Sequence, residues 1–321
     1  MSLSRRQFVA GAAGAAAAFG AGLFHAAAVE PYWLHVHERA ERLPGFPPSL
    51  SGLRVAHLTD LHLDPTLDPD YPSEIARRVR DELKPDLVAF TGDLTTHSRE
   101  HLPAAADWLA SFGVPTVACL GNHDYDPRTS ARVNGDFSLA DELQSRLAGT
   151  GVHLLRNAAV ELRFPGRDDP LYVAGVEDFY TGRLDAAAAV ASIPPQAPRL
   201  LLCHNPDAHP LVDEHARGGL ILAGHAHGGQ IRVPGLGPLL LPIREREKVA
   251  GPFALRHSRM YVSRGLGRLL WLRFNCRPEL PVHRLLVTAP GDASPARGEP
   301  SSPQPTPPSD GAPPTIAPPP G

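Results

Sequence analysis

The chain has 321 residues, of which 42% are hydrophobic and 20% are charged, with a formal net charge of −3. This composition is ordinary for a soluble globular enzyme and offers no basic surface for a polyanion, so we expect no nucleic-acid partner. Three cysteines, an odd number, argue against a disulfide framework.

An arginine pair and a long apolar stretch open the chain. "SRRQFV" at residues 4–9 resembles the twin-arginine export signal, and no Asp, Glu, Lys or Arg occurs from Gln7 to Val29. Residues 1–29 are predicted to be either a signal peptide cleaved near the small residues 26–28 or a retained N-terminal anchor, because about 20 apolar residues can span a bilayer. In both cases the basic end stays inside. We therefore expect export by the twin-arginine machinery to the periplasm or the outer face of the inner membrane.

The next two segments are predicted to be a linker, residues 30–49, and one α/β domain, residues 50–288. Within the domain, short apolar runs alternate with helical stretches. The predicted linker contains a histidine pair, His35 and His37, in "LHVHE". No buried run precedes this pair, so we do not expect it to bind metal.

Five apolar runs of the domain end in side chains that can bind metals. Ligands of open α/β sheets bind beyond the carboxyl ends of the strands, and an i,i+2 pair in an extended chain points to one side. A single Asp or His after a strand is usually a helix cap or an ordinary surface residue, but five in one context predict a metal site. In chain order the candidates are Asp60 with His62, Asp93, Asn122 with His123 and Asp124, His204, and His225 with His227.

The motifs D-x-H, G-D, G-N-H-D, H and G-H-x-H, in this order, resemble the calcineurin-like metallophosphoesterase superfamily over about residues 50–287. "GHAHGGQIRVPGLGPLLLP" and "YVSRGLG" resemble a branch of exported or membrane-associated bacterial enzymes, some acting on lipid-linked phosphodiesters or pyrophosphates. The resemblance implies a four-layer α/β/β/α sandwich of two mixed sheets, with a dinuclear metal site at the C-terminal ends of strands.

The resemblance also implies roles for the candidates. Their oxygen and imidazole donors suit two divalent ions, which could be Mn, Fe, Zn, Ni or Co. A hydroxide bridging the metals would attack phosphorus, His123 would assist the leaving group, and Asp124 would orient His123. The ligands would be Asp60, His62 and His227 at one metal and Asn122, His204 and His225 at the other, with Asp93 bridging both.

The sequence indicates the residues that contact substrate less clearly than it indicates the metal ligands. Arg264 and Arg128 could reach a phosphate, although an ordinary surface arginine is the simpler interpretation of each. Leu269, Leu270 and Trp271 are expected either to form an exposed rim for lipid or to belong to the core. No cap insertion is visible between the motifs, so we expect an open site that admits a large phosphate ester.

Residues 289–321 are predicted to be a disordered Pro-rich tail, because they contain no aromatic residue and few aliphatic ones. For the whole chain we predict an exported, monomeric metallophosphoesterase that cleaves a phosphodiester or pyrophosphate bond, with a lipid headgroup as the hypothesised substrate. One alternative is a non-catalytic scaffold, which the retention of every ligand and of His123 disfavours. A nucleotide phosphohydrolase is the other, and the aromatic content of 6% gives it little support.

Overall fold

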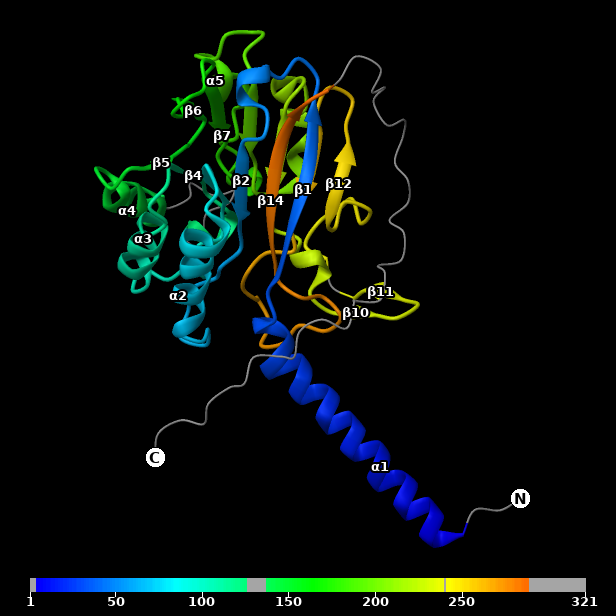
Figure 1. Ribbon diagram of the computed structural model, residues 1–321. Coiled ribbons are helices and arrows are strands. Elements are labelled where there is room, and N and C mark those ends of the chain that lie inside the picture. The colour runs from blue at the N-terminus through cyan, green and yellow to red at the C-terminus, as the bar shows by residue number, and fades with distance from the viewer. Residues whose placement is uncertain (1–3, 126–136, 240, 289–321) are drawn as a thin grey trace.

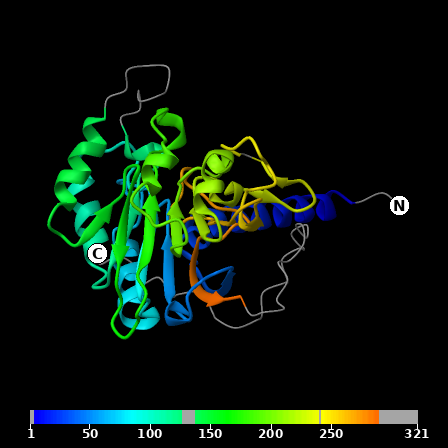
Figure 2. The same ribbon diagram turned by 90° about the horizontal axis from the view of Figure 1, so that it is seen from above.

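The computed structural model describes residues 4–125, 137–239 and 241–288. Two six-stranded mixed sheets pack face to face, and helices cover their outer faces (Figures 1 and 2). In spatial order the first sheet contains β1 (His35–Leu43), β14 (Glu279–Val287), β2 (Arg54–Leu58), β3 (Leu87–Thr91), β4 (Thr116–Cys119) and β5 (Val152–Leu154). The second contains β12 (Gly251–Ala254), β13 (Arg259–Val262), β9 (Leu220–Ala223), β8 (Arg199–Leu202), β7 (Leu171–Gly175) and β6 (Ala158–Leu162).

Alternating side chains of the central strands fill the spaces between the layers. Leu87 and Ala89 of β3 belong to the core between the two sheets, whereas Val88 and Phe90 belong to the core under the helices. The predicted four-layer α/β/β/α fold is therefore confirmed. Helices α2 (Asp70–Arg77), α3 (Leu102–Ala110) and α4 (Ser138–Leu147) cover the first sheet, and α5 (Ala186–Val190) and α6 (His209–Val212) cover the second.

Parallel pairing brings the strand ends together. In the first sheet β2, β3 and β4 are parallel neighbours, and in the second β7, β8, β9 and β13 are parallel neighbours. The carboxyl ends of these strands therefore lie at one edge of each sheet, which is where ligands of α/β sheets bind. A small hairpin, β10 (Arg232–Val233) with β11 (Gly237–Pro238), follows β9.

The interval 30–49, expected to be a linker, instead contributes a strand to the first sheet. All nine residues of β1 pair in parallel with β14, from His35 opposite Glu279 to Leu43 opposite Val287. The sequence of β1, "HVHERAERL", has no apolar run that would predict a strand. An edge strand tolerates such charged residues because one of its sides is not paired. The folded domain thus begins before residue 50.

Helix α1 (Arg5–Phe24) projects away from the domain (Figure 1). Ser4 caps it, because its hydroxyl accepts a hydrogen bond from the backbone N–H of Gln7. None of its residues is buried. The helical stretch Arg5–Tyr32 is long and apolar enough to cross a membrane, a property that a signal sequence would share.

Candidate metal centre

The seven predicted ligands follow β2, β3, β4, β8 and β9, and five of them occupy an unusual backbone conformation. Non-glycine residues rarely adopt positive φ, which costs about 1–3 kcal/mol each and persists mainly at functional sites. The five φ values are 54° for Asp60, 50° for His62, 56° for Asp93, 67° for His225 and 48° for His227.

Two glycines allow the ligand loops to approach one another closely. A Cβ atom on Gly121 would clash with Oδ1 of Asp93, and one on Gly224 would clash with Oδ2 of Asp60. Any larger side chain at either position would displace a candidate ligand.

Asp60, His62 and His227 form the first cluster. One potential ligand atom from each lies within 4.8 Å of the others, and all three residues are buried. The Nε2 atoms of His62 and His227 are 3.0 Å apart, and Nε2 of His227 is 3.4 Å from Oδ1 of Asp60. Two imidazole nitrogens and a carboxylate oxygen thus converge on one point.

Asp93, His204 and His225 form the second cluster. Nε2 of His204 lies 3.2 Å from Oδ2 of Asp93 and 3.2 Å from Nδ1 of His225. Nδ1 of His204 lies 2.7 Å from the carbonyl of Thr91, to which it can donate, so that Nε2 is free to bind a metal. Burial alone would lower the pKa of His204, but the negative charge of Asp93 outweighs it and raises the pKa to about 10. A proton therefore binds this site firmly in the metal-free chain, and a cation would replace it.

Asp93 connects the two clusters. Its Oδ2 lies 3.5 Å from Nε2 of His62 and 3.2 Å from Nε2 of His204. Within the described residues, Oδ1 of Asn122 is buried without a hydrogen-bond partner. Buried polar atoms normally have partners, so this free amide oxygen suits a metal ion. The side chains present therefore fit two neighbouring divalent ions.

Asp124 has a different role from the one predicted. Its carboxylate accepts hydrogen bonds from the backbone N–H groups of Asp93 at 2.8 Å, Leu94 at 2.8 Å, Thr95 at 3.2 Å and Gly121 at 2.9 Å. In the described part of the chain no hydrogen bond joins it to the His123 ring. The expectation that Asp124 orients His123 is wrong. Asp124 instead fixes the loops that carry the Asp93 and Asn122 side chains, because a carboxylate holds several N–H groups at once.

His123 lies beside the first cluster. Its half-buried ring packs edge-on against His62, with 4.9 Å between centroids, and lies 4.4 Å from the ring of His97. Its backbone N–H donates to Oδ1 of Asp93 at 2.8 Å, and its Nδ1 is buried without a partner. The sequence reasoning missed His97 as a neighbour, because "TTHSRE" has no strand or motif that points to the site.

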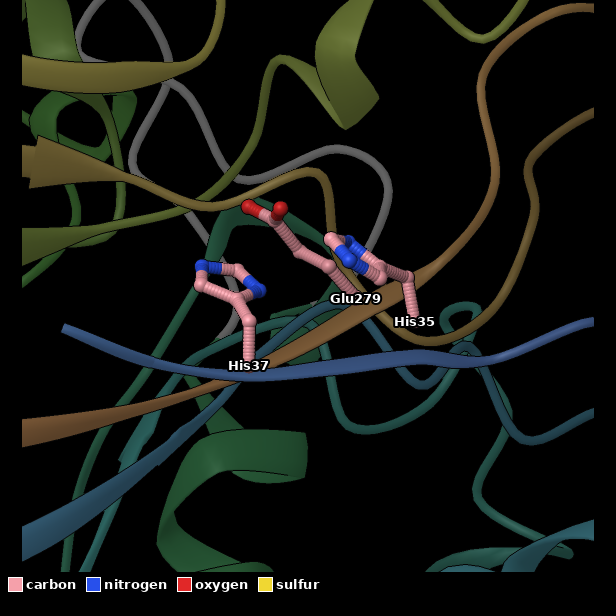
Figure 3. A group of neighbouring side chains, drawn as sticks. All are labelled: His35, His37 and Glu279. Atoms are coloured by element: carbon pink, nitrogen blue, oxygen red, sulfur yellow. The ribbon is translucent and has the colours of Figure 1, made fainter. Parts of the chain in front are cut away.

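A third group of potential ligands lies elsewhere, on the edge of the first sheet. Figure 3 shows His35 and His37 of β1 beside Glu279 of β14, with potential ligand atoms within 4.8 Å of one another. Unlike the carboxylates of the first two clusters, Glu279 is paired with an arginine, which does not give up its proton to a metal ion as an imidazole can. The Arg264 guanidinium donates to it at 2.8 Å and to Nδ1 of His35 at 3.0 Å. A metal ion here would meet this fixed positive charge, so we assign none.

Arg264 is therefore held in an ion pair with Glu279, and its predicted contact with phosphate stays a prediction. Burial alone would raise the pKa of Glu279, but Arg264 holds it below its usual value, as expected for a committed ion pair. The pair anchors the segment that packs on the first cluster, because a Cβ atom on neighbouring Gly265 would lie 2.7 Å from Cβ of Asp60. The other predicted phosphate contact, Arg128, lies outside the described residues.

Three further residues adjoin the clusters without having been predicted. Asp178 follows β7 and could have been found by the rule of polar strand ends. Tyr180, 39% exposed, places its ring 5.5 Å from that of His225. Arg273 is fully buried and brings a guanidinium nitrogen to 3.4 Å from Nδ1 of His227. An arginine inside "LLWLRF" gives no sequence signal of such a position.

Asp178 makes the stability of the metal-free chain depend on pH. Oδ2 of this carboxylate has no partner among the described residues, and burial raises its pKa to about 6. Because the folded pKa exceeds the unfolded value, protonated Asp178 stabilises the fold at low pH, and this contribution is lost as the pH rises through about 6. We expect Asp178→Asn to raise the free energy of unfolding at pH 8 by about 2 kcal/mol relative to wild type, and by much less at pH 4. Denaturant unfolding of chelator-treated protein at both pH values checks this, and an equal difference at both would contradict it.

Comparison with known proteins gives four findings. The family model for calcineurin-like phosphoesterase matches residues 53–229. The phosphodiesterase YaeI of Escherichia coli K12 is 32% identical over 288 residues, which cover 88% of this chain and 100% of YaeI. The UDP-2,3-diacylglucosamine pyrophosphatase LpxG of Chlamydia muridarum is 28% identical over 306 residues, 80% of this chain and 91% of LpxG. A transmembrane protein with metallophosphoesterase domain from Danio rerio is 31% identical over 258 residues, 75% of this chain and 54% of that protein.

Proposed function

The chain belongs to the calcineurin-like phosphoesterase family, and on this premise we propose that it hydrolyses a phosphodiester or pyrophosphate bond with the help of two divalent metal ions. The observation that carries the proposal is the position of Asp93, whose Oδ2 lies within 3.5 Å of an imidazole nitrogen in each cluster. A carboxylate shared between two imidazole clusters suits a two-metal phosphoesterase and has no evident use in a binding scaffold.

Each cluster would hold one ion, with Asp93 shared between them. Asp60, His62 and His227 would hold the first, and Asn122, His204 and His225 the second. This mixture of oxygen and imidazole donors suits Mn, Fe, Zn, Ni or Co. Two such ions supply an activated water and positive charge for the phosphoryl oxygens.

His123 would act on the leaving group. Burial lowers the pKa of this imidazole, and Asp93 partly opposes the shift. A phosphate anion beside the ring would favour its protonated form, so His123 would gain a proton as substrate binds. It could then donate that proton to the departing oxygen.

The proposed substrate carries a lipid-linked headgroup. Among the relatives, YaeI is a phosphodiesterase and LpxG is a pyrophosphatase of UDP-2,3-diacylglucosamine. Helix α1 supports this choice, because it can place the domain at a membrane.

Paired assays test the reaction class. The metal-loaded full chain is given a bis-aryl phosphodiester and the matching aryl phosphomonoester under identical conditions. The proposal predicts a higher kcat/KM for the diester. A clear preference for the monoester would refute it.

We also infer that α1 is retained as an anchor after twin-arginine export, with Arg5 and Arg6 as the export determinant. The predicted cleavage region is packed into the folded domain. Ala26 is buried, and its carbonyl accepts a hydrogen bond from the backbone N–H of Arg273 at 2.8 Å. The buried Glu30 carboxylate accepts another from the N–H of Cys276. Cleavage at residues 26–28 would remove part of this packing.

Intact-mass analysis of the mature protein checks the retention of α1. We expect membrane-fraction protein whose mass includes α1, and cytoplasmic accumulation of the Arg5→Lys/Arg6→Lys variant. A mature N-terminus between residues 27 and 30 would overturn the anchor, whereas normal export of the variant would overturn the twin-arginine route.

A further inference from the structure

Two neighbouring segments, residues 236–239 and 269–274, carry six large exposed apolar side chains, which we call the apolar rim. Two of them are exposed to an extent unusual for their size, with 76% for Leu236 and 58% for Trp271. Groups of exposed apolar side chains mark sites that meet another apolar surface. The members of the apolar rim are Leu236, Leu239, Leu269, Leu270, Trp271 and Phe274.

The two segments that carry the apolar rim are held together by hydrogen bonds. The backbone N–H of Arg232 donates to the carbonyl of Phe274 at 2.9 Å. The side chain of Gln230 accepts from the N–H of Leu269 and donates to the carbonyl of Leu272, both at 3.0 Å. Gln230 stands three residues after His227 of the first cluster, so the apolar rim is continuous with the metal-binding loop.

The apolar rim also adjoins the helical turn His25–Val29 that follows α1, which we call the base of α1. The segment that contains Trp271 contacts this base through two arginines, since the N–H of Arg273 reaches the carbonyl of Ala26 at 2.8 Å and the Arg268 guanidinium reaches that of Ala27 at 3.3 Å. In Figure 1 the hairpin β10–β11 and the base of α1 lie at the same end of the domain. With 20 residues, α1 is about 30 Å long, which matches the hydrocarbon core of a bilayer.

The charges near the apolar rim favour a lipid surface as its partner. Residues 231–244 and 264–278 contain no Asp or Glu. Among their arginines, Arg244 is exposed and Arg232 and Arg268 are half-buried, whereas Arg264 and Arg273 make contacts inside the domain. Arginines around exposed Leu and Trp side chains suit the interface of a bilayer that contains anionic lipids, where the apolar groups enter the acyl boundary. A protein partner would not require the apolar helix beside the surface.

We propose that the apolar rim inserts into the interfacial layer of the membrane that α1 spans, so that the metal centre faces the lipid headgroups. The anchor alone holds the domain to the membrane at one point, whereas a second contact fixes the catalytic edge toward the membrane. The effect of this orientation on catalysis rests on the proposed function. A lipid-linked phosphate ester would then be hydrolysed at the membrane surface, where its headgroup lies.

Tryptophan quenching tests the insertion directly. The full chain is placed in vesicles of phosphatidylglycerol and brominated phosphatidylcholine. The bromine atoms on the acyl chains quench the fluorescence of tryptophans that enter the acyl layer. Trp33 lies near the base of α1 and Trp108 is buried under the first sheet, so the matched pair is Trp33→Phe and Trp33→Phe/Trp271→Phe. We expect strong quenching in the first variant and little in the second. Equal quenching in both would overturn the proposal and leave a protein partner as the occupant of the apolar rim.

A functional comparison separates this proposal from the proposed reaction. Leu270→Ser/Trp271→Ser should lower hydrolysis of a vesicle-borne lipid phosphodiester about tenfold while changing hydrolysis of a soluble bis-aryl diester by less than about twofold. Leu211→Ser removes a leucine of comparable exposure on α6 and should change neither rate. Equal losses on both substrates would contradict the apolar rim as a membrane contact. If wild type hydrolyses neither substrate while its Trp271 is quenched, the proposed function fails and the membrane contact stands.

Discussion

Asp93→Ala is expected to lower kcat/KM for diester hydrolysis at least about 10³-fold. The reason is geometric, because Oδ2 of Asp93 lies 3.5 Å from Nε2 of His62 and 3.2 Å from Nε2 of His204. Removing this carboxylate would take a ligand from both proposed metal sites and leave the buried His204 without the carboxylate that lies 3.2 Å from it. Metal analysis of the purified variant should therefore show fewer equivalents of metal bound at both sites.

Asp60→Ala provides the matched comparison for Asp93→Ala. Asp60 belongs to the first cluster, so its removal should lower the metal affinity of that cluster alone and leave about one equivalent of metal bound. Asp81→Ala, which removes an exposed carboxylate paired with Arg80, controls for charge and should retain wild-type activity. If Asp93→Ala keeps two bound metals, or more than about a tenth of the activity, Asp93 does not bridge the ions.

His123→Asn is expected to lower kcat by about 10²–10⁴-fold without loss of either metal. The His123 ring packs on His62 and His97, and its Nδ1 has no partner among the described residues. If the ring donates a proton to the departing oxygen, the loss should be smallest for a leaving group that needs no protonation. The measurement is the wild-type to variant ratio of kcat for a nitrophenyl diester and for a diester with an alkyl alcohol leaving group.

His153→Asn replaces an exposed histidine of β5 and serves as the control, with no expected change in kcat. An equal loss for both leaving groups would contradict proton donation and leave His123 as a residue that positions phosphate. Metal loss in His123→Asn would place it in the first cluster instead.

The candidate ligands could be predicted from the sequence because parallel strands put their carboxyl ends at one edge. Asp60 and Asp93 follow adjacent strands of the first sheet, His204 and His225 follow adjacent strands of the second, and packing of the two sheets brings these ends together. The same rule would have found Asp178 after β7. Local pattern and topology agree here, so residues far apart in the chain could be grouped without coordinates.

Side-chain partners could not be predicted in the same way. The pairing of Arg264 with Glu279 depends on the close approach of β13 and β14, which belong to different sheets. Asp124 turns toward backbone N–H groups because four of them converge on it, and no sequence spacing reports such convergence. Strand β1 was missed because its position at the sheet edge tolerates charged residues.

The most direct test of the dinuclear site is metal-dependent hydrolysis by the full chain in detergent. The protein is stripped with chelator, and Mn, Zn, Ni, Co or Fe is then added singly while bound metal and hydrolysis of a bis-aryl phosphodiester are measured together. We predict that activity returns as a second equivalent binds, and that Asp93→Ala prevents this return. Failure of the stripped chain to bind any of these metals, or full activity with a single bound ion, would contradict the dinuclear site.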